Sequence, residues 1–89
     1  MRVDSDTVSS TGRISNTRHK VKAIQFHARS ANTGSVIVGI STVSATRGRE
    51  LTADSTTVYN FEGGSVEFNV FYTHITVGGD LLDWEAIFA

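Results

Sequence analysis

The chain contains no cysteine, no long apolar run and, from Glu50 to Ala89, no Lys or Arg. The lack of cysteine excludes disulfides and thiolate metal sites as supports for the fold. Its apolar runs are a few residues long, whereas a helix needs ~20 apolar residues to span a bilayer. The first residues form no apolar block of the signal-peptide type. The sequence therefore predicts a soluble, unprocessed domain without a membrane partner.

Charge is divided sharply along the chain. Residues 1–49 carry eight Lys or Arg and two Asp, a balance of +6, and residues 50–89 carry seven Asp or Glu and no base, a balance of −7. Either the two halves neutralise each other within one chain, or the basic half of one copy meets the acidic half of the next. A chain of this length buries only roughly 60–65% of its unfolded surface. Self-association is therefore an expected source of further stability.

Composition favours strands. Ser, Thr and Val together supply more than a third of the residues, and no window sustains the apolar spacing of a helix. Short strands are predicted in segments separated by turns that contain Gly, Asn or Asp: 21–28, 35–41, 42–45, 57–61, 66–77 and 81–88. Short strands at this spacing predict an all-β fold, a small antiparallel β-sandwich or a jelly-roll-like barrel.

Alternating residues predict which strand faces are buried. The strands at 21–28 and 35–41 are expected to pair antiparallel with each other. Within 66–77 the apolar residues change parity, which predicts a bend, a bulge or a break around residues 70–72. Ile24, Phe26 and Ala28 share one face of the first strand, and Val36, Val38 and Ile40 share one face of the second. The side chains expected to point inward from the last strand are Leu82, Trp84, Ala86 and Phe88.

Residues 1–20 have few aliphatic side chains, so we predict an extended N-terminal arm at 1–20 and a β-sandwich domain at 21–89. Two alternatives remain open for the arm: a disordered tail, or a segment that becomes ordered on a neighbouring subunit. In the second case its aliphatic residues are the anchors. The residues predicted to bind a partner are Arg2, Val3, Val8, Arg13, Ile14, Arg18, Arg47 and Arg49.

Residue types that carry chemistry occur without the spacing that chemistry needs. His19, His27 and His74 do not have zinc-site spacing, although neighbouring strands can bring His27 and His74 together. No serine lies at a nucleophile elbow, so we expect neither an enzyme nor a cofactor or metal. Asp80 follows Gly78-Gly79, where a turn is a more common role than a calcium site.

Two binding roles are weighed against simpler interpretations. The basic residues of the first half are spread among Ser and Thr, and the acidic second half repels phosphate, so a nucleic-acid partner is unlikely. Trp84, with Tyr59 and Tyr72, is a candidate sugar-stacking platform. The inward parity of Trp84 instead predicts that its ring belongs to the core.

The order of several motifs resembles small virion proteins of tailed bacteriophages. Residues 32–45, NTGSVIVGISTVSA, are followed by Gly48 and Leu51, and later by a strand containing Tyr72, a Gly79-Asp80 turn and a strand with Trp84-Glu85-Ala86-Ile87. The resemblance covers about Val21 to Phe88. One departure is at residues 52–55, TADS, where that family usually has a Pro-Gly turn, and it concerns the geometry of one loop.

This resemblance implies a structural or host-contacting part of the particle and supplies no catalytic residues. The small size favours a capsid decoration or cement protein on the capsid surface of the virion, bound to the major capsid protein. A homo-oligomer is expected, with a trimer as the first choice. The alternative is a receptor- or glycan-binding module of a tail or head fibre. A glycan site needs Trp84 or Tyr72 at the surface, whereas a cement protein needs them in the core.

Overall fold

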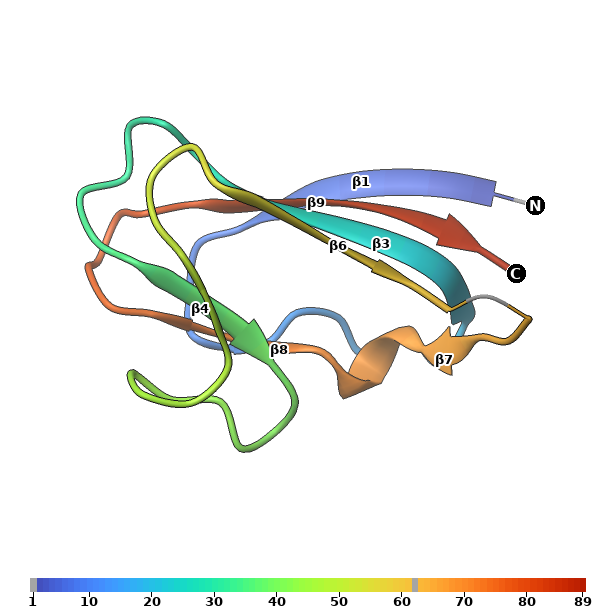
Figure 1. The fold of residues 1–89 in the computed structure, drawn as a ribbon. Coiled ribbons are helices and arrows are strands. Elements are labelled where there is room, and N and C mark those ends of the chain that lie inside the picture. Colours follow the sequence, from blue (N-terminus) through green and yellow to red (C-terminus); the bar gives the residue numbers. More distant parts are fainter. Residues whose placement is uncertain (1, 62) are drawn as a thin grey trace.

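The computed structural model describes residues 2–61 and 63–89 as two antiparallel sheets that face each other (Figure 1). The all-β sandwich predicted from the sequence is confirmed, and no α-helix occurs in this described part of the chain. The elements are β1 (Arg2–Val8), β2 (Gly12–Arg13), β3 (Lys20–Ala28), β4 (Val36–Gly39), β5 (Arg49–Leu51), β6 (Thr56–Asn60), β7 (Val66–Glu67), the 3₁₀ turn η1 (Phe68–Val70), β8 (Tyr72–Ile75) and β9 (Leu82–Phe88).

The larger sheet has five strands in the order β1-β9-β3-β6, with β7 also paired to β3. The smaller sheet has four strands in the order β2-β8-β4-β5. The first and last strands lie side by side (Figure 1), because β1 pairs with β9 along its whole length, from Arg2 opposite Phe88 to Val8 opposite Leu82.

The core lies between the sheets. The predicted alternation of the last strand is confirmed, since Trp84 is only 9% exposed. The rings of Phe68 and Trp84 meet edge-on with their centroids 4.7 Å apart, a favourable aromatic geometry that joins the two layers. The buried cluster consists of Val21, Ile24, Phe26, Ala28, Val36, Val38, Leu51, Phe68, Phe71, Leu82, Trp84, Ala86 and Phe88.

The predicted interruption around residues 70–72 is also confirmed. β7 ends at Glu67 in the larger sheet, η1 covers Phe68–Val70, and β8 begins at Tyr72 in the smaller sheet. The change of apolar parity along this segment therefore marks the place where the chain crosses between sheets.

The predicted antiparallel pairing of the strands at 21–28 and 35–41 is wrong. β3 pairs with β6, β7 and β9, whereas β4 pairs with β5 and β8 in the other sheet. Where this connection crosses between the sheets, the buried Asp80 carboxylate accepts hydrogen bonds from the backbone N–H groups of Thr33, at 3.0 Å, and Gly34, at 2.8 Å. The turn at 32–34 therefore contacts the connection between β8 and β9 and does not close a hairpin.

The strand predicted at 42–45 is wrong as well, and Ile40 does not point inward, since it is 59% exposed. This segment is a turn with one isolated bridge between Ser44 and Arg47. The strand that pairs with β4 comes later, at β5. Gly48 has a φ of +126°, and a Cβ at this position would lie 2.6 Å from Cγ2 of Ile37. Glycine therefore allows the loop to fold closely over β4.

The separate N-terminal arm is not confirmed. The segment is extended, but β1 pairs with β9 and β2 pairs with β8 of the same chain. Six of the seven residues in β1 are exposed and Val8 is half-buried. Composition therefore predicts the lack of buried side chains but not the pairing, because ladder hydrogen bonds come from the backbone and depend little on residue type.

Candidate functional site

The outer face of the larger sheet carries an apolar strip, which we define as Val3, Ala23, Val58 and Ile87. Val3 on β1 is opposite Ile87 on β9, and Ile87 is opposite Ala23 on β3. Val58 on β6 is the diagonal neighbour of Ala23, because it lies opposite Gln25. Val3 is 58% exposed, Val58 59% and Ile87 36%. The strip thus crosses the whole width of β1-β9-β3-β6 and lies open to its surroundings.

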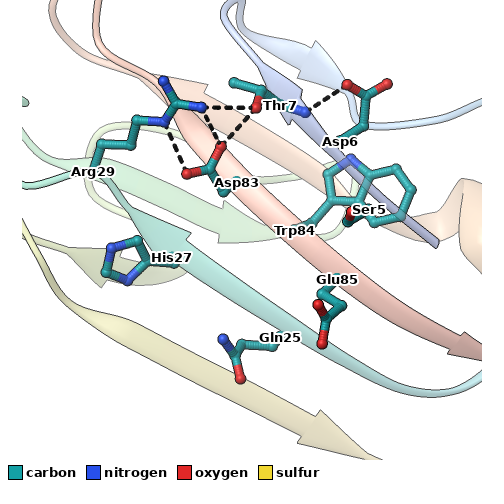
Figure 2. Close-up of a pocket in the computed structure, with 9 residues that line it drawn as sticks. All are labelled: Ser5, Asp6, Thr7, Gln25, His27, Arg29, Asp83, Trp84 and Glu85. Atoms are coloured by element: carbon teal, nitrogen blue, oxygen red, sulfur yellow. Dashed lines mark hydrogen bonds and ion pairs between the residues drawn. The ribbon is translucent and has the colours of Figure 1, made fainter. Parts of the chain in front are cut away.

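Polar residues border this strip on one side. They line a shallow, open hollow of ≈ 370 Å³ on the same sheet (Figure 2). An apolar centre beside a polar border is the usual anatomy of a protein–protein interface. The outward-facing polar residues form two rows across the strands. One row consists of Ser5, Glu85 and Gln25, and the other of Thr7, Asp83, His27 and Thr56.

Three of the polar residues form a cluster that closes one end of the hollow (Figure 2). Thr7 Oγ1 donates a hydrogen bond of 2.6 Å to Asp83 Oδ1. Arg29 donates from Nε to Asp83 Oδ2 at 2.9 Å and from Nη2 to Oδ1 at 3.0 Å. Arg29 Nη2 also donates to Thr7 Oγ1 at 3.2 Å. The Arg29–Asp83–Thr7 cluster thereby ties β1, β9 and the end of β3 together.

The electrostatics of this cluster favour its ionised form. The hydrogen bond from Arg29 lowers the pKa of Asp83, with a smaller contribution in the same direction from Thr7, while partial burial acts in the opposite direction. The same hydrogen bond raises the pKa of Arg29. Because both oxygens of Asp83 accept hydrogen bonds from neighbouring side chains, this carboxylate holds strands together and is not poised to transfer a proton.

The structure does not bring His27 and His74 together. His27 is on the larger sheet, with Nδ1 2.8 Å from Thr56 Oγ1 and Nε2 3.5 Å from Asp54 Oδ1. His74 is on β8 of the smaller sheet. Across residues 2–61 and 63–89, no group of three or more His, Asp or Glu side chains is placed to hold a metal ion.

The residues predicted to bind a partner are spread over both sheets. Val3 belongs to the apolar strip, whereas Val8 and Ile14 pack against the core of their own chain. Arg18 forms an ion pair with Glu67, with Nε 2.9 Å from Oε1.

The other four predicted residues are all basic. The guanidinium carbon of Arg2 lies 4.8 Å from the ring centroid of Phe88. Arg47 and Arg49 are exposed in the loop after β4 and in β5, and Arg13 lies on β2 in the smaller sheet. The eight residues therefore do not form one continuous binding patch.

Arg13 and Tyr72 define a second surface feature, on the outer face of the smaller sheet. The Tyr72 hydroxyl accepts hydrogen bonds from Arg13 Nη2 at 2.6 Å and Nε at 3.0 Å. With Ile40, Asn69 and other neighbours they line a shallow hollow of ≈ 410 Å³. We call this the Tyr72 patch. A glycan site was expected to need Trp84 or Tyr72 at the surface. Tyr72 is half-buried, and Trp84 belongs to the core.

Part of the charge division is neutralised within the chain. Arg18–Glu67 and Arg29–Asp83 each join a base from the first 49 residues to an acid from the rest. Folding of the two halves against each other, one of the two expected outcomes, is therefore realised in part.

Comparisons with known proteins assign no family. The chain matches no protein-family model, and no curated protein or solved structure shows significant similarity to it. In the part of the chain that the structure describes, no helix is long and apolar enough to cross a membrane.

Sequence reasoning missed both the apolar strip and the Arg29–Asp83–Thr7 cluster. A signal for the strip is present in the last strand, where the outward positions read Asp83, Glu85 and then Ile87. A single exposed aliphatic residue is ordinary, and it marks a contact surface only where the fold gathers several such residues into one patch. The cluster has no comparable signal, because Arg29 and Thr7 lie 54 and 76 positions before Asp83 in the sequence.

Proposed function

We propose that this chain is a structural protein of a tailed-phage virion that decorates the capsid, docking the outer face of its larger sheet on the major capsid protein. The apolar strip carries this proposal. Its four side chains are aliphatic and run across a sheet face, so they suit a broad contact with another protein. A sugar site instead uses the face of an aromatic ring. The motif order from Val21 to Phe88, similar to that of small phage virion proteins, supports the same assignment.

A protein interface of ordinary size would occupy a substantial part of this chain's surface. A standard interface buries about 800 Å² on each side, which is roughly one sixth of the 5130 Å² accessible surface of this chain. The strip alone is smaller than that, so docking engages the polar rows as well. Capsid lattices repeat one surface many times, and a homo-oligomer, with a trimer as the first expectation, contacts several copies at once. Multiple attachment strengthens weak single contacts.

Co-sedimentation with phage heads tests this proposal. The heads are assembled from the genome that encodes this chain, with its own gene deleted, and purified protein is then added. Val58→Asp places a charge in the strip, and Ile40→Asp is the matched control, because both residues are 59% exposed. We expect Val58→Asp to lose binding and Ile40→Asp to keep it, with both variants folded by circular dichroism. Wild-type protein that stays in the supernatant contradicts the proposal.

The second candidate is a receptor- or glycan-binding module, and the Tyr72 patch favours it. The Arg13 guanidinium covers one face of the Tyr72 ring, with its carbon 5.2 Å from the ring centroid, and Arg13 with the nearby Asn69 amide supplies hydrogen-bond donors to a sugar at this aromatic side chain. This candidate predicts that Tyr72→Ala abolishes binding to host surface glycans, whereas Val58→Asp leaves it unchanged. Binding of Tyr72→Ala and of Val58→Asp, each measured on phage heads and on host glycans, therefore separates the two functions.

A further inference from the structure

Strand β1 is attached to the sandwich with little side-chain packing. Only Val8 among its seven residues is even half-buried. Beneath it lies an open groove of ≈ 260 Å³, bordered by residues of β1 and of the 15–17 segment, with Phe68, Trp84 and Phe88 among its lining residues. The strand is therefore held mainly by its backbone ladder to β9 and by the Arg29–Asp83–Thr7 cluster, with Val8 against the core and Arg2 over the Phe88 ring as its other side-chain contacts.

The free edge of β1 is occupied by its own side chains. The backbone N–H of Ser5 donates to the Asp4 carboxylate at 2.9 Å, and that of Thr7 donates to the Asp6 carboxylate at 2.8 Å. In an antiparallel ladder alternate residues bond to the neighbouring strand, so the N–H groups of Ser5 and Thr7 point away from β9. Carboxylates on an edge discourage the addition of another strand. On this side of the larger sheet, pairing between copies is therefore more favourable at the edge of β9 that β1 covers than at the free edge of β1.

The connection after β1 is short and crosses between sheets. β1 ends at Val8 in the larger sheet, and β2 begins at Gly12 in the smaller one. Thr11 is already fixed to β8, because its Oγ1 accepts a hydrogen bond of 2.9 Å from the Ile75 N–H. Gly12 has a φ of +137°, a conformation that favours glycine. Short hinge loops of this kind favour exchange of an element between copies.

We infer that β1 exchanges between copies of this chain, so that residues 2–8 of one copy occupy the β9 edge of a second copy. The ladder and the Arg29–Asp83–Thr7 cluster re-form between the two chains, and only residues 9–10, between β1 and the fixed Thr11, change conformation. Exchange of an identical element creates a dimer with few new contacts. This inference does not depend on the proposed virion role.

Disulfide trapping tests the exchange in a chain that has no cysteine of its own. Val3 and Ile87 are cross-strand partners, and they form a non-hydrogen-bonded pair, since alternate residues of β1 bond to β9. Such pairs have Cα atoms about 4.5 Å apart, within the range for a disulfide. Val3→Cys protein is mixed with Ile87→Cys protein of a different mass, incubated at several concentrations and oxidised. We expect a mixed disulfide whose yield rises with concentration.

Two controls make the result decisive. A mixture of Val3→Cys with Val58→Cys measures random collision, because Val3 and Val58 are 58% and 59% exposed. A single chain with both Val3→Cys and Ile87→Cys, oxidised in dilute solution, must form an intrachain disulfide and so verify the register. A mixed disulfide well above the collision control supports exchange. A yield equal to that control, or a double variant that forms no intrachain disulfide, overturns it.

Discussion

Thr7 donates a hydrogen bond of 2.6 Å to Asp83, although 76 positions separate the two residues in the sequence. Arg29 completes the cluster with two hydrogen bonds to the same carboxylate. The first strand of the chain is thus fastened to the last by polar contacts on the outer face of the sheet. Strand β1 is consequently more sensitive to charge and pH than the apolar core is.

Replacement of Asp83 by Asn is expected to lower the free energy of unfolding at neutral pH. It should also make the free energy of unfolding less dependent on pH in the acidic range. Arg29 lowers the pKa of Asp83 below its ordinary value of 3.8. The ionised cluster therefore contributes stability above about that pH, and the contribution is lost as the pH falls through the lower pKa of the folded state. Urea unfolding at pH 7 and pH 3 measures the effect.

The control for this prediction is Glu85→Gln, which removes an exposed carboxylate two positions along β9. We expect the difference between wild type and Asp83→Asn to shrink at pH 3, and Glu85→Gln to resemble wild type at both values. If the free energies of unfolding of wild type and Asp83→Asn differ by the same amount at pH 7 and at pH 3, the ionised cluster does not contribute to stability.

Trp84→Ala is expected to destabilise the fold strongly. Trp84 is 9% exposed and meets Phe68 edge-on, and large-to-small substitutions of this kind cost about 3–5 kcal/mol. The stability of a small domain is of similar size, so the variant should be unfolded or marginal in thermal melts. Val58→Ala is the control, since Val58 is 59% exposed. A Trp84→Ala protein with a normal melting temperature disproves the core role.

Gly48→Ala is expected to disturb the loop between β4 and β5. The φ of +126° is unfavourable for alanine, and its Cβ would lie 2.6 Å from Cγ2 of Ile37 and 2.9 Å from the Val38 carbonyl oxygen. Backbone strain of this kind costs roughly 1–3 kcal/mol. Gly78→Ala is the matched control, because no atom lies within 4 Å of its added Cβ. Equal stability of the two variants in urea would show that the loop does not need glycine.

Asp80→Ala is expected to loosen the connection between β3 and β4. Hydrogen bonds from the backbone N–H groups of Thr33 and Gly34 lower the pKa of Asp80, whereas burial acts in the opposite direction. Without the carboxylate both N–H groups lose their partner, so their amide hydrogens should exchange faster with solvent. Asp80→Asn retains one acceptor oxygen and should give an intermediate rate. Exchange that is unchanged in both variants contradicts this role for Asp80.

Local pattern was sufficient to predict the parts of the fold that depend on burial. The alternation of β9 predicted that Trp84 is buried, and the parity change predicted an interruption near Tyr72, although not that it takes the form of the 3₁₀ turn η1. Burial selects residue type directly, because an inward position on a strand requires an apolar side chain.

Pairing partners were not predictable in the same way. The hydrogen bonds between β1 and β9 involve the backbone, so the polar sequence of β1 contains no sign of its neighbour. The turn at 32–34 resembled a hairpin, but the chain crosses to the other sheet there, and the turn is hydrogen-bonded to Asp80, 46 positions away from Gly34. The candidate docking face was missed for the same reason, since its four residues come from four strands that only the fold brings together.

A cryo-electron microscopy map of the virion encoded with this chain tests the central claim most directly. The account predicts density for the β-sandwich on the capsid surface, with Val3, Val58 and Ile87 facing the major capsid protein. Density at a tail or head fibre, with the Tyr72 patch facing outward toward host glycans, would contradict it, as would a capsid surface that carries no such subunit.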